Sequence, residues 1–229
     1  MEHRVRQADA EGRTLEIEHR WVPLEQISSN LEQAVIVAED HRFREHRGVD
    51  WNAVAEEVRY EGGRPVTWWN PDDLRALWAA TLYYWENRHD IRGRSTISQQ
   101  LARNLYLSPE RSTLRKAREV LVARRLERYF SKDRILELYL NVAEWGPGIF
   151  GAEAAARTYF GKSAAELSLE EAAALAATLP HPLTSNPRDN PGRMAWRREL
   201  ILERLQGPDE EPEPIPLPDP VPTPEPGPP

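Results

Sequence analysis

The apolar pattern of the chain changes from a period of two to a helical period. In Thr14–Val22, apolar Leu15 and Ile17 alternate with glutamates, and this alternation predicts a short strand. From about Leu31 to Leu205 the apolar positions recur every three or four residues, which predicts helices joined by loops. We therefore expect a mostly α domain with a short N-terminal strand.

Capping residues indicate where several of these helices begin. Asn70 and Pro71 combine an N-cap with proline at the first helical position. The apolar residues that follow share one helix face: Leu74, Leu77, Trp78, Leu82 and Trp85. Ser131 is expected to cap a further helix, and Ser168 with Glu171 forms a capping box ahead of an alanine-rich helix that ends near residue 180.

The composition changes sharply at Gly207. The last 23 residues contain eleven prolines, six acids and no base, a mixture that builds neither a helix nor a core. A solvated spacer is favoured over a ligand for a partner domain. We therefore expect a strand and lead-in over 1–30, a helical domain over 31–206 and a disordered, Pro-rich acidic tail over 207–229.

Charge and composition exclude several classes of protein. The tail accounts for six of the seven net negative charges, so the body is near neutral and a globally basic nucleic-acid-binding protein is not indicated. The chain has no cysteine, which excludes disulfides and thiol nucleophiles. No window approaches the roughly 18 apolar residues of a membrane span, and no signal-peptide core follows Met1.

The first candidate for chemistry is a Glu-Asp pair at the end of an apolar run. Ala34–Ala38 leads directly into Glu39 and Asp40. A carboxylate at the end of a buried helical segment is partly withdrawn from water, which suits a general base. The competing interpretation pairs Glu39 with Arg42 one turn further on, and this stretch taken alone favours that pair.

The helix expected over 112–129 is strongly basic. Arg111, Arg115 and Glu119 are spaced by four and lie on one stripe, with Arg118 at its edge. Such a cluster suits a phosphate or pyrophosphate, because guanidinium groups bind these oxygens bidentately. The spacing alone favours a solvated face, and the absence of interleaved aromatic residues gives no support to nucleic-acid binding.

A third piece lies in the segment 93–107 (GRSTISQQLARNLYL). Ile97, Leu101 and Leu105 are spaced by four and are expected to form the buried side of a helix. Gln99, Gln100 and Arg103 lie close together on another side, where amides and a cation can contact sugar hydroxyls or phosphate oxygens.

Together these segments resemble the bacterial peptidoglycan glycosyltransferases, found as the polymerase domain of class A penicillin-binding proteins and as monofunctional enzymes. Five stretches carry the resemblance in the family's order: Glu39–Gly48 (Glu-Asp-x-x-Phe-x-x-His-x-Gly), residues 93–104 (Gly-x-Ser-Thr-Ile-x-Gln-Gln, then a base and Asn), Arg115–Glu119 (Arg-Lys-x-x-Glu), Lys132–Asn141 and Gly148–Lys162. The sequence Asn-Val-Ala-Glu-Trp-Gly at 141–146 is closer to the monofunctional enzymes.

The resemblance implies a lysozyme-like fold and a defined reaction. Such enzymes polymerise lipid II into β-1,4-linked glycan, with inversion of configuration and undecaprenyl pyrophosphate as the leaving group. The implied catalytic residues are Glu39 as general base and Glu119 as a second acidic residue that orients cations or a divalent metal (Mg²⁺ or Mn²⁺). The implied substrate contacts are Ser95, Thr96, Gln99, Gln100, Arg103, Arg111, Arg115, Lys116 and Arg118, whereas Asp40, Phe43 and His46 shape the first motif.

Four features depart from the family pattern. Arg103 replaces the usual lysine, and Arg94 stands where a small residue is usual. The segment between the first two motifs is longer than expected, and the N-terminal membrane span is not found. Six aromatic residues crowd this longer segment: Trp68, Trp69, Trp78, Tyr83, Tyr84 and Trp85. Contact with the membrane interface and packing on the protein's own core are equally favoured for them.

The expected location is the outer, periplasmic face of the cytoplasmic membrane. Expected partners are lipid II, the growing glycan chain, the membrane surface, and cell-wall synthesis or division proteins, with no nucleic acid. Two rival functions are a lysozyme-like hydrolase of the finished glycan and a non-catalytic scaffold that binds lipid II or cell-wall proteins. The arginine cluster argues against the hydrolase, which needs a second carboxyl acid instead, and the presence of both glutamates argues against the scaffold.

Overall fold

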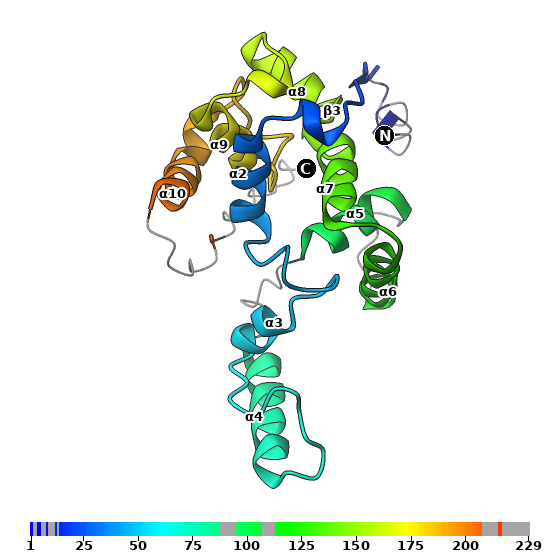
Figure 1. The fold of residues 1–229 in the computed structure, drawn as a ribbon, viewed down its shortest axis with the longest axis vertical. Helices are drawn as coiled ribbons and strands as arrows, with labels where there is room; N and C mark the ends of the chain where they lie inside the picture. The colour runs from blue at the N-terminus through cyan, green and yellow to red at the C-terminus, as the bar shows by residue number, and fades with distance from the viewer. Residues whose placement is uncertain are drawn as a thin grey trace, which may run out of the picture.

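The computed structural model describes residues 1, 4–5, 8, 12, 14–87, 95–106, 113–207 and 215–216. It confirms a mostly helical domain of the lysozyme-like class with a small sheet. The helices of the body are α2 (Ser29–Glu39), α5 (Ile97–Tyr106), α6 (Thr113–Tyr129), α7 (Lys132–Val142), α8 (Ala152–Phe160), α9 (Leu169–Thr178) and α10 (Ala195–Gln206). Three short 3-10 turns join them: η1 (Leu24–Gln26), η2 (Ala164–Glu166) and η3 (Pro191–Met194). Helices α3 (Trp51–Glu57) and α4 (Pro71–Asn87) project from this body (Figure 1).

The sheet has three short strands in the order β1-β3-β2. Strand β1 (Glu18–His19) runs parallel to β3 (Ile149–Phe150), and β2 (Glu144–Gly146) runs antiparallel to it. The strand predicted over 14–22 is therefore confirmed but shorter, because its partner β3 offers only two residues. The chain passes very close to Gly148, where an added Cβ would lie 2.2 Å from the Glu16 carbonyl oxygen, so this approach requires glycine.

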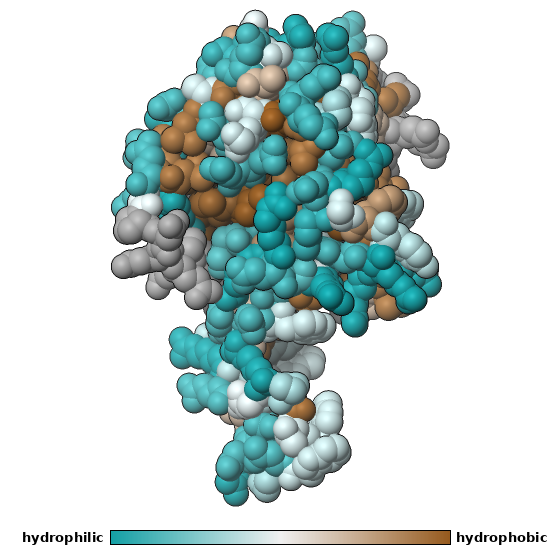
Figure 2. Space-filling model, in the orientation of Figure 1, coloured by the Kyte–Doolittle hydropathy of each residue, from teal (hydrophilic) through white to brown (hydrophobic). Residues whose placement is uncertain are grey.

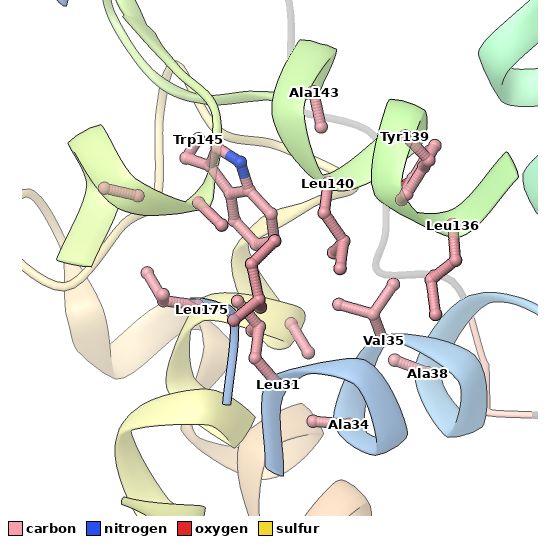
Figure 3. Close-up of a cluster of buried hydrophobic side chains, with 14 of the residues drawn as sticks. Leu31, Ala34, Val35, Ala38, Leu136, Tyr139, Leu140, Ala143, Trp145 and Leu175 are labelled. Carbon is pink, nitrogen blue, oxygen red and sulfur yellow. The ribbon is translucent and has the colours of Figure 1, made fainter. Parts of the chain in front are cut away.

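The core lies between α2, α7 and α9 (Figure 3). Helix α2 contributes Leu31, Ala34, Val35 and Ala38, which recur at helical spacing and are all buried. The fully buried Trp145 packs among residues of α2, α7 and α9. Because its apolar face is held along its whole length, α2 places its last residue, Glu39, at a fixed position.

The predicted caps of the body helices are confirmed. The Ser131 hydroxyl accepts a hydrogen bond from the Arg134 amide at 3.2 Å. The Ser168 hydroxyl accepts from the Glu171 amide at 3.3 Å, and the Glu171 carboxylate accepts from the Ser168 amide at 2.9 Å. These reciprocal bonds satisfy amides that have no partner inside the first helical turn.

Helix α4 begins at Pro71 as predicted, but it forms no apolar core with the body. Only Asp73 and Ala80 are buried along it. The Asp73 carboxylate accepts from the Gly63 amide at 2.7 Å and from the Thr67 amide at 2.8 Å. Arg59 lies over the ring of Tyr83, 4.6 Å from its centroid. We call α3, α4 and the loop between them the hairpin; polar and cation–π contacts hold it together.

The hairpin exposes most of its large aromatic side chains. Five tryptophans are at least 60% exposed: Trp51, Trp68, Trp69, Trp78 and Trp85. In Figure 2 the hairpin is mainly teal and white rather than brown, because the Kyte–Doolittle scale does not rank tryptophan among the most hydrophobic residues. Among the described residues, no helix has the length and apolar content that crossing a bilayer requires.

Two expectations about burial need correction or refinement. Leu105 is 39% exposed, so the buried side of α5 ends one turn earlier than its spacing predicted, where α5 itself ends at Tyr106. In the tail, Ile215 is only 3% exposed and belongs to the core cluster. The composition of the tail did not predict this contact; the residues around it at 208–214 and 217–229 lie outside the described part of the chain.

Candidate active site

The turn after α2 ties the first motif to the start of α5. Asp40 accepts hydrogen bonds from the His46 ring nitrogen Nε2 at 2.9 Å and from the Ile97 amide at 2.9 Å. Phe43 is fully buried beneath this turn. These contacts hold Asp40, Phe43 and His46 in the turn, and they bring the end of α2 next to α5.

Gly48 closes the first motif against two other elements. Its carbonyl oxygen accepts from the Thr96 hydroxyl at 2.7 Å. Its φ is +90°, and an added Cβ would lie 3.1 Å from the backbone of Ala123 in α6. A glycine is required here because the backbone conformation is left-handed and α6 lies directly against it. The motifs of α2, α5 and α6 are thereby packed together.

Both carboxylate oxygens of Glu39 have protein partners. The Gln100 amide nitrogen Nε2 donates to Oε2 at 2.8 Å, and Nη2 of Arg197 donates to Oε1 at 2.8 Å. The side chain of Glu39 is 8% exposed. Each carboxylate oxygen can accept more than one hydrogen bond, so Glu39 keeps the capacity to accept a proton from a substrate hydroxyl.

Gln100 holds Glu39 rather than facing open solvent with its amide. Its Nε2 also donates to the Ser95 carbonyl oxygen at 3.1 Å, and its Oε1 accepts from the Tyr139 hydroxyl at 2.9 Å. Burial raises the pKa of Tyr139 well above its usual value, and the nearby Glu39 charge adds to this effect. Tyr139 therefore stays a neutral donor that fixes the orientation of the amide.

Glu119 lies at the centre of a separate charged cluster on α6. It is 1% exposed, and its two oxygens accept from Arg115 Nη1 at 3.0 Å and from Lys116 Nζ at 2.7 Å. The Ser95 hydroxyl donates to Glu119 at 3.4 Å and accepts from Lys116 at 2.7 Å. The buried Glu119 carboxylate therefore holds the Arg115 guanidinium and the Lys116 ammonium at defined positions.

Ser95 joins the two clusters. Its carbonyl oxygen accepts from Gln100, which holds Glu39, while its hydroxyl contacts Lys116 and Glu119. A continuous path of hydrogen bonds therefore runs from the glutamate of α2 to the glutamate and cations of α6. Three stretches that are far apart in sequence form one site.

The remaining predicted residues are placed less directly. Gln99 is 4% exposed, and its side-chain oxygen accepts from the Thr96 amide at 3.0 Å, so both residues build the start of α5 rather than face a substrate. Arg103 is close enough to Tyr139 to lower the pKa of that phenol, against the larger effect of burial. Arg118 is exposed on α6, and Arg111 lies outside the described residues.

Sequence reasoning missed Arg197 on α10. This arginine is fully buried although its residue type is seldom buried without a partner. A signal was present, because Arg197 lies three residues after Met194 and four before Ile201, both of which are buried. A base on the apolar stripe of a helix predicts a buried acceptor, and that acceptor is Glu39.

The surroundings of Glu119 do not fit a divalent metal. Its two oxygens are engaged by the cations Arg115 and Lys116, whereas Mg²⁺ needs carboxylate oxygens that are free to coordinate it beside waters or phosphates. In the part of the chain that the structure describes, no group of three or more metal-binding side chains gathers. The cations themselves supply the positive charge at this place.

Comparison with known proteins identifies the family of the chain. The sequence model of the Transglycosylase family matches residues 8–63 and 72–206. The chain therefore belongs to the Transglycosylase family. It is 43% identical to the biosynthetic peptidoglycan transglycosylase of Bordetella pertussis over 203 residues, covering 89% of this chain and 75% of that protein. The corresponding protein of Janthinobacterium sp. is 41% identical over 207 residues (90% and 79%), and that of Azoarcus sp. is 45% identical over 192 residues (79% and 72%).

Proposed function

We propose that this peptidoglycan transglycosylase polymerises lipid II by inverting transfer, with undecaprenyl pyrophosphate as the leaving group. The single observation that carries the proposal is the hydrogen-bonded path from Glu39 through Gln100 and Ser95 to the Lys116–Glu119 cluster. It joins a carboxylate suited to accept a proton with cations suited to receive negative charge.

Glu39 is the general base of the proposed reaction. It takes the proton from the 4-hydroxyl of the acceptor sugar while that oxygen forms a bond to the anomeric carbon of the donor. The bond between this carbon and the pyrophosphate oxygen breaks, and its electron pair leaves with the pyrophosphate. Attack from the face opposite the leaving group converts an α-linked donor into a β-linked product.

The leaving group needs charge stabilisation more than protonation. A pyrophosphate departs as an anion, so fixed cations lower the barrier as that charge develops. Lys116 is 46% exposed at its side chain while its ammonium contacts the buried Glu119, a placement that leaves it accessible to a substrate. We assign Lys116, Arg115, Arg103 and Arg118 to this positive region, with Glu119 orienting the first two. Arg111 is a further contact that the family resemblance implies, and it lies outside the described residues.

The exposed aromatic face of the hairpin supports a membrane-bound reaction. Leu74, Trp78, Leu82 and Trp85 are exposed at helical spacing along α4, and indole groups favour the headgroup region of a bilayer. We propose that this face rests on the outer leaflet of the cytoplasmic membrane, where the lipid-linked donor resides. The growing glycan and other cell-wall synthesis proteins are the further partners of this proposal.

Incubation with lipid II tests the proposed function. The wild-type chain is expected to form glycan polymer, and Glu39→Gln is expected to reduce the rate by at least about a thousandfold, because it removes the base but keeps the side-chain shape. Glu45→Gln is the matched control, since Glu45 is an exposed carboxylate of the same motif. Undiminished polymer formation by Glu39→Gln, with folding intact, would remove Glu39 from the role of base.

A further inference from the structure

The C-terminal tail contacts the body at a point close to the candidate base. Ile215 is 3% exposed and packs in the core cluster, and the Pro216 carbonyl oxygen accepts from Arg197 Nη1 at 2.9 Å. The described tail segment, drawn in red in Figure 1, lies near the end of α2 that carries Glu39. The family match ends at residue 206, so this contact comes from outside the segment shared with the family.

Arg197 links the tail to the carboxylate. Its Nη2 donates to Glu39 Oε1 at 2.8 Å and to the Ala38 carbonyl oxygen at 3.0 Å, while its Nη1 donates to Pro216. One guanidinium group therefore binds the end of α2 and the tail at the same time. The position of the tail and the position of Glu39 are coupled through a single rigid, planar group.

The tail satisfies part of a buried charge. Arg197 is fully buried, and its Nε has no hydrogen-bond partner among the described residues. Without Pro216, Nη1 would lose its described acceptor as well, and a buried guanidinium with unsatisfied donors is costly. Ile215, the residue before Pro216, is buried in the core cluster and anchors the tail next to the bond that Pro216 accepts from Arg197.

We propose that the tail segment at Ile215–Pro216 supports catalysis by fixing Arg197, which in turn positions Glu39. Arg197 is a positioning residue in this scheme, because it acts on the base and not on the substrate. Gln100 holds Oε2 of Glu39 and Arg197 holds Oε1, so both contacts are needed to fix the plane of the carboxylate. This inference rests on the proposed function, since it names how the same base is held.

Release of the tail is expected to lower kcat and to leave KM nearly unchanged. A small displacement of a base from its reactive position slows the chemical step by about ten- to a hundredfold. Substrate binding, in contrast, relies on the cations of α6, whereas the described contacts of Ile215 and Pro216 are with the core and with α10. A rise in KM with unchanged kcat would contradict the proposal.

Substitution of Ile215 in the full chain tests the effect. Ile215→Asp places a charge in the apolar site and is expected to release the segment, whereas Ile215→Val keeps an apolar side chain and is expected to retain kcat. If Ile215→Asp does not fold, Ile215→Ala gives the same direction with a smaller effect. Unchanged activity of the aspartate variant would overturn the proposal, and so would increased activity, which would mean that the tail obstructs the site.

A double-mutant cycle tests the route through Arg197. Arg197→Lys, Ile215→Asp and the double variant are compared for kcat on lipid II. Because the tail acts through Arg197, the second substitution is expected to add little to the first. If the fold-losses in kcat of the two single variants multiply in the double variant, the tail does not act through Arg197. Arg198→Lys is the matched control, because Arg198 is the exposed neighbour on the same helix.

A measurement without substrate separates failure of the inference from failure of the proposed function. Thermal unfolding of Ile215→Asp is expected at a lower temperature than that of Ile215→Val, because the buried contact is lost. If the wild-type chain makes no glycan, the proposed function fails, and the catalytic part of the inference fails with it. If the wild-type chain makes glycan and Ile215→Asp makes it equally fast, only the inference fails.

Discussion

Trp145 in the body and Trp78 in the hairpin lie in opposite environments. Trp145 of the body is fully buried in the core, whereas Trp78 on α4 is 68% exposed. The body is held by apolar side chains from α2, α7 and α9, but the hairpin is held by amides that donate to Asp73 and by Arg59 over Tyr83. Hydrophobic content alone therefore does not decide burial; a second apolar surface has to be present.

The family match covers the body and most of the hairpin. Its break, at residues 64–71, falls in the loop before α4 and on the first residue of that helix. The site residues described above belong to α2, α5, α6, α7 and α10 of the body. The described side-chain contacts of Glu39 and Glu119 come from the body, so the proposed catalysis is assigned to the body and the proposed membrane contact to the exposed indoles of the hairpin.

The largest expected difference between the two regions is in stability. Trp145→Ala is expected to lower the free energy of unfolding by about 3–5 kcal/mol, because it leaves a large cavity in the core. Trp78→Ala is expected to change it by no more than about 0.5 kcal/mol, as for other exposed positions. Urea unfolding of both variants measures the contrast. Equal losses would show that α4 packs against a core of its own.

This contrast also shows what the sequence could predict. Periodicity and caps predicted α4, α7 and α9, because these signals are local: Ser131, Ser168 and Glu171 bond within their own helix ends. The same local pattern could not decide whether the apolar face of α4 is buried. That depends on whether another element reaches it, which is a property of the tertiary fold.

The site was predictable where motifs carry the residues and not where packing alone brings them together. Glu39, Gln100, Ser95, Lys116 and Glu119 come from the recognised motifs, and the structure joins them. Arg197 lies 158 residues from Glu39 and outside every motif. Its helical spacing indicates that it is buried, but its pairing with Glu39 depends on α10 packing on α2. The docking of Ile215 is equally non-local, because prolines and acids surround it in the sequence.

The next largest contrast is in catalysis. Glu119→Gln is expected to lower kcat/KM for lipid II by about a hundredfold, because a neutral amide no longer holds Lys116 and Arg115 in place for the leaving group. Glu61→Gln is the matched change in the hairpin, where the carboxylate is exposed, and is expected to keep full activity. Similar losses in both variants would contradict a site confined to the body.

Membrane binding is expected to show the reverse contrast. Combining Trp78→Ala with Trp85→Ala should weaken binding to phospholipid vesicles by about tenfold, since loss of two partly inserted indoles removes roughly 1.4 kcal/mol or more of apolar burial. Vesicle sedimentation measures this change. Trp196→Ala provides the control from the body, where the indole is also partly exposed at 41%. If the control weakens binding as much as the pair, the hairpin is not the contact surface.

The smallest expected effect is a dependence of the stability of the folded hairpin on pH. Hydrogen bonds from the Gly63 amide and then the Thr67 amide lower the pKa of Asp73 below its usual value. A carboxyl with a lowered folded pKa stabilises the folded hairpin above its unfolded pKa of about 3.9, and this contribution is lost as the pH falls through the folded pKa. Tryptophan fluorescence of the hairpin should therefore report loosening of the hairpin at acidic pH, and Asp73→Asn should show the same loosening already at neutral pH.

Asp72→Asn is the control for this prediction. Asp72 is exposed, and its described hydrogen bonds are with the nearby Asn70 and Arg75. The same fluorescence change in Asp72→Asn would mean that Asp73 is not the group that titrates.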